Sequence, residues 1–211
     1  MRRVVTDEAA VFWERHHGAR RAWDGRPNPL LVEVAGPLPP GAAADLGCGA
    51  GGDTIWLAGH GWQVTAVDIA GTAVERVRAR AHDLGVGARV TAERHDLARS
   101  FPAGAFDLVS AQYLQTPFEF PRPRVLRTAA HALRPGGLLL IVDHGSTAPW
   151  SWNQDPGVRY PAPGELAADL DLDPSQWHVL RADTPQRVAT GPSGETATVT
   201  DTVLLIQRAG A

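Results

Sequence analysis

Residues 42–53, Ala-Ala-Ala-Asp-Leu-Gly-Cys-Gly-Ala-Gly-Gly-Asp, contain the pattern that decides the fold. Three small apolar residues lead into Asp45, and glycines follow at positions 47, 49, 51 and 52. A helical pattern over residues 54–58 comes next. A short buried strand, a glycine-rich turn and a helix N-terminus allow backbone N–H groups to approach a ligand closely, because glycine has no Cβ in the way. The stretch therefore predicts a ligand site at a strand-to-helix turn.

A second acid indicates a nucleoside-type cofactor. The next predicted strand, residues 62–67, is followed by Asp68, which comes 21 residues after Gly47. An acid at the tip of the second strand of a βαβ unit can accept hydrogen bonds from a ribose diol. The glycine spacing also satisfies G-x-G-x-x-G, so an NAD(P)-dependent oxidoreductase is one alternative. Asp45 argues against it, because a carboxylate aimed at the turn repels a pyrophosphate and suits a cofactor with a cationic tail.

The sequence from Asp45 to Gly51 resembles the first motif of the class I S-adenosylmethionine (SAM)-dependent methyltransferases. The resemblance covers roughly residues 25–208, and the lead-in Trp23–Pro29 is similar to small stand-alone members related to the tellurite-resistance and thiopurine types. It implies SAM as cofactor, S-adenosylhomocysteine as product, and methyl transfer by in-line displacement to a small-molecule nucleophile (S, O, N or metalloid). A catalytically inactive SAM-binding protein is the other alternative, since no catalytic residue is assured.

The resemblance also implies roles around the cofactor. Asp45 and the glycine turn would lie under the methionine part of SAM. Asp68 would bind the ribose hydroxyls and Ile69 would pack on the adenine, although Asp68 could instead cap the following helix. Asp96 and Leu97, after the third strand, would border the adenine ring, unless they form a plain loop. The predicted cofactor-binding residues are Asp45, Gly47, Cys48, Gly49, Gly51, Asp68, Ile69, Asp96, Leu97 and Gln112.

The acceptor side has fewer signals. Gln112 and Tyr113 follow the fourth predicted strand, where the resemblance places the reactive methyl, so Gln112 could contact the cofactor tail and Tyr113 the substrate. His144 follows the fifth strand, and a histidine there could act as a general base or orient an anionic substrate. We therefore name His144 and Tyr113 as candidate catalytic residues, and Trp23, Tyr113 and Trp152 as candidate substrate contacts. Simple packing or loop roles are the alternatives for each, and no metal site is predicted.

Composition limits the classes of function. The 211 residues suit one domain, and a net charge of −3 without a basic block gives no reason to expect a nucleic-acid or membrane partner. All 20 basic residues are arginines, which excludes lysine-based chemistry, and Cys48 is the only cysteine, which excludes an intrachain disulfide. The N-terminus becomes acidic before any apolar run develops. We therefore expect a cytoplasmic protein, either a monomer or a homodimer.

The alternation of patterns predicts an α/β fold. We expect a doubly wound, three-layer Rossmann-like sandwich with a mostly parallel seven-stranded sheet and an antiparallel strand from a terminal β-hairpin. Residues 1–211 would form one domain, with residues 1–40 as an N-terminal helical cap and 41–211 as the core. The predicted helices are 7–23, 30–35, 52–60, 71–84, 122–134 and 164–170. The predicted strands are 42–46, 62–67, 88–94, 105–111, 138–143, 177–190 and 196–208.

Overall fold

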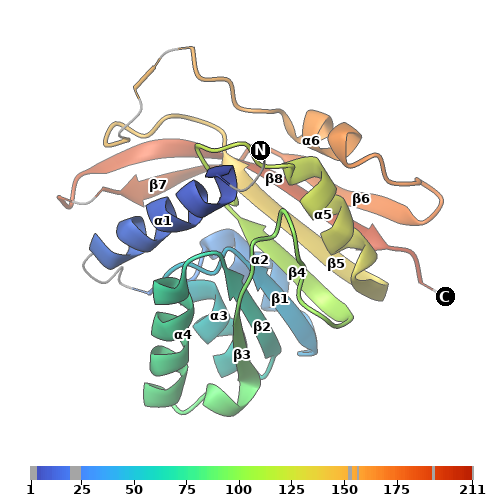
Figure 1. Ribbon diagram of the computed structural model, residues 1–211. Coiled ribbons are helices and arrows are strands. Elements are labelled where there is room, and N and C mark those ends of the chain that lie inside the picture. Colours follow the sequence, from blue (N-terminus) through green and yellow to red (C-terminus); the bar gives the residue numbers. More distant parts are fainter. Residues whose placement is uncertain (1–3, 20–24, 152–153, 156, 192, 211) are drawn as a thin grey trace.

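The structure is a computed structural model, shown in Figure 1. It describes residues 4–19, 25–151, 154–155, 157–191 and 193–210. Two of the predicted substrate contacts, Trp23 and Trp152, lie outside the described residues.

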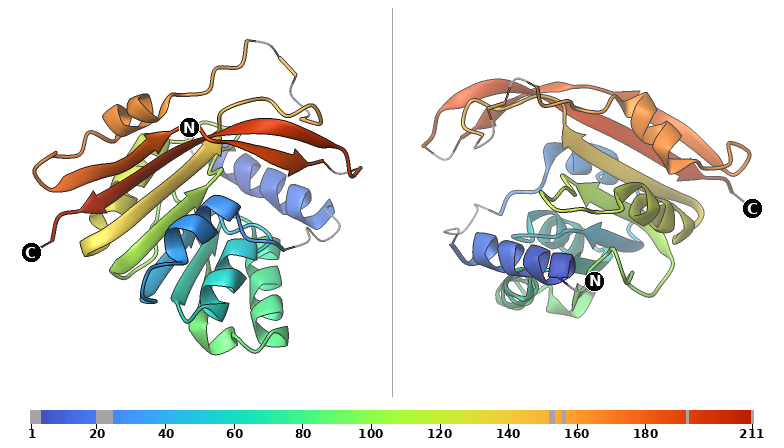
Figure 2. Two further views of the ribbon diagram at one scale, coloured as in Figure 1. Left: turned by 180° about the vertical axis from the view of Figure 1, so that it is seen from behind. Right: turned by 45° about the horizontal axis from the view of Figure 1, so that its top comes forward.

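One mixed sheet organises the chain, with the strand order β3-β2-β1-β4-β5-β8-β6 and with β7 paired to β8. The first five strands pair in parallel, and β8 runs antiparallel to β5, β6 and β7. Figure 2 shows the long β8 lying beside β5. The strands are β1 (Ala42–Leu46), β2 (Gln63–Asp68), β3 (Val90–Arg94), β4 (Phe106–Gln112), β5 (Leu133–His144), β6 (Trp177–Asp183), β7 (Gln186–Thr190) and β8 (Thr196–Arg208).

The α/β fold class is confirmed, but the predicted number of strands is wrong, because the sheet has eight strands and not seven. The predicted single strand 177–190 is divided into β6 and β7. The division falls at Pro185, which has no N–H to donate to a ladder and instead accepts a hydrogen bond from the Asp201 N–H through its carbonyl (3.0 Å). Both short strands therefore pair with different parts of the same long β8.

Helices cover both faces of the sheet and make three layers (Figures 1 and 2). Successive residues of the central strands point to opposite faces: Leu108 and Leu140 join the core with α2 and α3, whereas Val109 and Ile141 join the core with α5 and α6. The helices are α1 (Val4–Ala19), α2 (Pro29–Ala35), α3 (Gly52–Gly59), α4 (Gly71–Asp83), α5 (Arg122–His131) and α6 (Pro163–Leu170), and a 3₁₀ turn covers Gly87–Arg89.

Some helix and strand boundaries differ from the prediction. The helix predicted to end at residue 134 ends at His131, and β5 begins at Leu133 and not at residue 138. Because β5 begins at Leu133, this residue pairs with Phe106 of the neighbouring β4. Residues 134–136 are exposed, and the buried part of the strand follows them. No helix within the described ranges has the length and apolar composition that a bilayer span requires.

The strand order places a ligand crevice. The chain passes from β1 through β2 to β3 on one side and from β4 to β5 on the other, so the direction reverses between β1 and β4. In open α/β sheets, ligands bind at such a switch point, beyond the carboxyl ends of the strands. The glycine turn after β1 and Gln112 at the end of β4 both lie there.

Candidate functional site

The glycine turn after β1 has the backbone geometry that its sequence predicts. Gly47 and Gly51 have φ angles of +73° and +82°, in the left-handed region that favours glycine. The N–H groups of Gly47 and Cys48 both donate to the Val67 carbonyl, at 2.8 and 3.0 Å. A Cβ on Gly51 would lie only 2.8 Å from Val77 Cγ2 on α4. The turn is therefore tied to β2 and packed closely against α4 before α3 begins.

Asp68, at the end of β2, is buried and faces this turn, with 6% of its surface exposed. Its Oδ2 accepts a hydrogen bond from the Gly49 N–H at 3.0 Å, and its Oδ1 accepts one from the Ala70 N–H at 2.9 Å. Each carboxylate oxygen retains a further lone pair that can accept from a ligand hydroxyl. Asp68 thus connects the glycine turn to the start of α4.

The capping role considered for Asp68 belongs to another acid. Glu14, on α1, accepts hydrogen bonds from the Gly71 and Thr72 N–H groups at 2.9 and 3.0 Å, and from the Thr72 hydroxyl at 2.6 Å. These bonds lower the pKa of Glu14, the Thr72 hydroxyl most of all. A carboxylate at a helix N-terminus satisfies unpaired N–H groups and complements the helix dipole. The N-terminal helix is therefore fastened beside the glycine turn.

Asp45, which is buried, and Asp53, which is half-buried, form an acidic pair beneath the turn. Asp45 is 2% exposed, and its Oδ2 accepts a hydrogen bond from the Thr54 hydroxyl at 2.5 Å. Burial, and then the neighbouring Asp53, raise the pKa of Asp45 to about 7. Burial also raises the pKa of Asp53 to about 6. Two carboxyl groups of this kind favour the approach of a cation.

Asn28 links this acidic pair to Gln112, on the side of the site where the methyl acceptor is expected. The sequence analysis missed this role. The N–H of Asn28 donates to Asp53 Oδ1 at 2.6 Å, and its Nδ2 donates to Gln112 Oε1 at 2.8 Å. Gln112 Nε2 donates in turn to the Ser110 hydroxyl at 2.9 Å. The sequence signal at Asn28-Pro29 is that of a helix cap, and Asn28 Oδ1 does accept from the Leu30 N–H. That signal contains nothing about Gln112.

Asp96, which follows β3, has one carboxylate oxygen that lacks a hydrogen bond. Its Oδ1 accepts from the Ala98 N–H at 3.0 Å. Its Oδ2 is buried and accepts no hydrogen bond from the described part of the chain, although Arg99 Nε lies 3.4 Å away in an ion pair. Beside it, Leu97 packs against the core on the α5 side. Ile69, half-buried after β2, accepts a hydrogen bond from Arg94 Nε at its carbonyl.

Tyr113 and His144, the two candidate catalytic residues, are brought together. Their rings are stacked with centroids 4.3 Å apart and an interplanar angle of 20°. The Tyr113 hydroxyl donates to Asp201 Oδ1 at 3.0 Å and accepts from Arg187 Nη2 at 2.9 Å. Burial raises the pKa of Tyr113, and partial loss of water lowers that of His144. Sequence patterns gave no sign of Arg187 or Asp201.

The loop after β4 is anchored by a buried ion pair. Both oxygens of Asp143, which is fully buried, accept from Arg122 Nη2, at 2.7 and 2.6 Å. Arg122 Nε donates to the Leu114 carbonyl at 2.9 Å. The Asp143 carboxylate is therefore engaged in holding Arg122 and, through it, the loop after β4. Across the described ranges, no group of three His, Cys, Asp or Glu side chains is placed to hold a metal ion.

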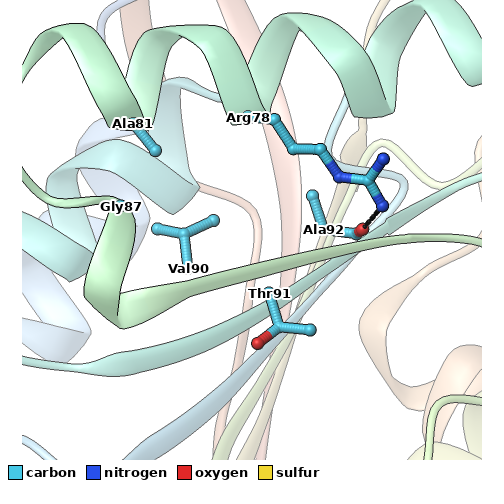
Figure 3. A pocket seen from close by; sticks show the side chains of 6 residues that line it. All are labelled: Arg78, Ala81, Gly87, Val90, Thr91 and Ala92. Atoms are coloured by element: carbon cyan, nitrogen blue, oxygen red, sulfur yellow. Dashed lines mark hydrogen bonds between the residues drawn. The ribbon is translucent and has the colours of Figure 1, made fainter.

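A hollow of about 360 Å³ lies elsewhere, between α4 and β3 (Figure 3). In it the Arg78 side chain reaches from α4 to the Ala92 carbonyl, at 2.5 Å. It contains none of the predicted site residues. It is lined by Arg78, Ala81, Gly87, Val90, Thr91 and Ala92.

Fold and site together define an α/β protein with a glycine turn and flanking acids that suit a nucleoside cofactor. A family model described as "Methyltransferase domain" matches residues 43–137. "Probable thiol methyltransferase 2" of Arabidopsis thaliana is 30% identical over 145 residues, which cover 66% of this chain and 64% of the relative. "Ribosomal RNA small subunit methyltransferase G" of Stenotrophomonas maltophilia is 34% identical over 165 residues, which cover 77% and 65%. The chain thus spans slightly less than two thirds of these relatives.

A solved structure is similar over nearly the whole chain. It comes from work on "Conversion of a Disulfide Bond into a Thioacetal Group during Echinomycin Biosynthesis", with 28% identity, a TM-score of 0.71, and coverage of 97% of this chain and 91% of the other. Over residues 43–137 the chain matches a methyltransferase domain, and its similarity to these proteins supports the class I SAM-dependent methyltransferase resemblance that its glycine motif predicts.

Proposed function

We propose that this protein transfers the methyl group of SAM to a small molecule, with sulfur as the favoured acceptor atom. The observation that carries the cofactor assignment is the acidic pair beneath the glycine turn, formed by the buried Asp45 and the half-buried Asp53. A cationic amino-acid tail relieves the repulsion within this pair, whereas a pyrophosphate adds to it. SAM supplies a methyl group on a sulfonium, which departs as a neutral thioether.

The residues of this chain fit that cofactor. The Asp45–Asp53 pair would attract the ammonium group, and backbone N–H groups of the turn would bind the tail carboxylate. Asp68 would accept the ribose hydroxyls. The buried Oδ2 of Asp96, which is ion-paired with Arg99 but accepts no hydrogen bond from the described part of the chain, would accept one from the adenine amino group, since a buried carboxylate oxygen without a hydrogen bond is costly unless a ligand satisfies it. Leu97 and Ile69 would provide apolar contacts to the ring, and Gln112 would border the tail.

Two observations favour sulfur as the acceptor atom. One relative is named as a probable thiol methyltransferase, and the structure with 97% coverage comes from work on a disulfide. A thiol loses its proton at a pH little above neutrality, so it needs only a modest base. His144, with its lowered pKa, is uncharged near pH 7 and can accept that proton. The similarity to a ribosomal RNA methyltransferase makes RNA the competing acceptor, against which the net charge of −3 argues.

We also propose that residues 1–211 act as one domain, with residues 1–40 as a helical cap over the cofactor. The contacts of Glu14 with the start of α4, and the hydrogen bond from Trp13 Nε1 to the Thr116 hydroxyl at 3.3 Å, support this assignment. They place α1 against two segments that flank the glycine turn.

Calorimetric titration of the purified protein with S-adenosylhomocysteine, NADH and NADPH tests the cofactor. We expect micromolar binding of S-adenosylhomocysteine alone. Thiols, oxyanions, phenols and a structured RNA would then be compared as acceptors, with mass spectrometry of the products. Methylation of thiols is the expected result. Binding of a nicotinamide cofactor would overturn the proposed function, and methylation of RNA alone would overturn the acceptor class.

Affinity for S-adenosylhomocysteine should depend on pH. The carboxyl pKa values of about 7 and 6 mean that Asp45 and Asp53 hold protons below neutrality. The ligand ammonium favours the ionised carboxylates, so affinity should rise with pH through about 6 to 7, and binding should release protons in that range. By the same linkage, folding stability falls as pH rises from 3.8, the ordinary pKa of an aspartate, through this range, because the folded state holds protons that the unfolded chain has lost.

The substitution Thr54→Val tests whether Asp45 causes this pH dependence. The variant removes the hydroxyl bond that lowers the pKa of Asp45, so the rise in affinity should move to higher pH. Calorimetry in two buffers of different ionisation enthalpy measures the proton release. Thr91→Val, on the exposed side of β3, is the matched control. A pH-independent affinity in the wild-type protein would show that these carboxyls do not face the ligand.

A further inference from the structure

A polar cluster beyond the cofactor turn joins four strands of the sheet. Tyr113 follows β4, His144 ends β5, Asp201 lies on β8 and Arg187 on β7. The Asp201 carboxylate is 1% exposed and accepts hydrogen bonds from the Tyr113 hydroxyl at 3.0 Å and from Arg187 Nε at 2.5 Å. Arg187 Nη2 donates to the Tyr113 hydroxyl at 2.9 Å. The terminal hairpin β7–β8 therefore holds the tyrosine at the carboxyl end of the parallel strands.

The backbone of Tyr113 is strained, which indicates that this arrangement is needed. Its φ angle is +50°, a conformation that an aromatic residue rarely adopts. Such strain persists only where the surroundings determine the geometry, and it is concentrated at functional sites. Here the Tyr113 N–H donates to the Val142 carbonyl at 2.7 Å, while the ring stacks on His144 and the hydroxyl is bound by Asp201 and Arg187.

Building on the proposed function, we propose that Arg187 and Asp201 are positioning residues for His144, acting through Tyr113. They hold the Tyr113 hydroxyl, and the Tyr113 ring holds the exposed imidazole of His144 at the acceptor side. The imidazole takes the proton of the acceptor thiol while the thiol sulfur forms its bond to the methyl carbon. The electrons of the broken carbon–sulfonium bond stay on the departing sulfur, so charge and atoms balance.

The groups that act on His144 come from three neighbouring elements. Asp201 on β8 favours its protonated form, and Arg187 on β7 disfavours it. Tyr113 stacks on it from the end of β4. The preceding residue, Asp143, points to the opposite face of β5, where its carboxylate binds Arg122. The two charged groups of the cluster therefore affect His144 in opposite directions.

Histidine-selective NMR titration of the full chain tests this inference, with the His144 signal assigned from its loss in His144→Gln. We expect the pKa of His144 to move down in Asp201→Asn and up in Arg187→Gln. Tyr113→Phe leaves the ion pair in place and removes only one hydroxyl, so it remains informative if a charge variant fails to fold. It should give a broadened or shifted His144 signal. Arg134→Gln, which breaks an exposed pair with Asp107, is the control and should change nothing.

Kinetics connects the cluster to catalysis. With a thiol acceptor, Tyr113→Phe should lower kcat about tenfold and shift the acidic limb of its pH profile, while S-adenosylhomocysteine affinity stays within twofold. An identical His144 titration in all variants, or an unchanged kcat in Tyr113→Phe, would overturn the inference while the proposed function stands. Failure of the wild-type protein to bind S-adenosylhomocysteine would overturn the proposed function and this catalytic role together. The titration would still report whether the four residues are coupled.

Discussion

Asp68→Ala is expected to weaken binding of S-adenosylhomocysteine by about 1–3 kcal/mol, which is about 5-fold to 150-fold. The substitution removes the proposed acceptor for the ribose hydroxyls. It also releases the N–H groups of Gly49 and Ala70, which the carboxylate holds at 3.0 and 2.9 Å. Both effects act on the cofactor side of the glycine turn, so affinity should fall more than stability.

Calorimetric titration of the folded variant measures this loss, and circular dichroism checks the fold. Asp83→Ala is the matched control, because Asp83 is an exposed acid at the other end of α4. It should leave the affinity unchanged. Wild-type affinity in a folded Asp68→Ala protein would show that Asp68 does not contact the cofactor.

Gly52→Ala is expected to weaken S-adenosylhomocysteine binding by roughly tenfold, or about 1.4 kcal/mol. A Cβ at Gly52, the first residue of α3, would lie 2.4 Å from the Arg26 carbonyl oxygen. Because that oxygen belongs to the backbone, the lead-in segment must move away from α3. The movement disturbs the two hydrogen bonds by which Asn28 joins Asp53 to Gln112. Alanine itself favours a helix, so the melting temperature should change little.

The same helix provides the control for this variant. A Cβ on Gly59, the last residue of α3, meets no atom within 4 Å. Gly59→Ala should therefore bind the ligand as the wild-type protein does. Equal affinity in the two variants would mean that the lead-in around Asn28 has no part in the cofactor site.

Much of the fold could be predicted because its signals are local. Glycine spacing, the apolar runs of β1 and β2 and the acids at their ends lie within a few tens of residues, and they predict a βαβ unit with a nucleoside site. Boundaries were less predictable. The start of β5 at Leu133 depends on pairing with Phe106. The division at Pro185 depends on which part of β8 lies opposite each short strand.

The candidate site divides in the same way. Its cofactor half could be predicted residue by residue from the motif. The interactions between residues on the methyl-acceptor side of the site could not be predicted in this way. Asn28 and Gln112 are separated by 84 positions, and Tyr113 and Asp201 by 88. No periodic pattern or motif relates residues that far apart in the chain.

The sequence by itself determined the resemblance to methyltransferases, the α/β class and the backbone geometry of the glycine turn, because each depends on residues close together in the chain. The tertiary structure decided that β8 lies against β5, and therefore that Asp201 and Arg187 reach Tyr113 and His144. Strand order follows from the packing of the whole sheet between its helices. Only that packing decides which distant side chains meet at the carboxyl ends of the strands.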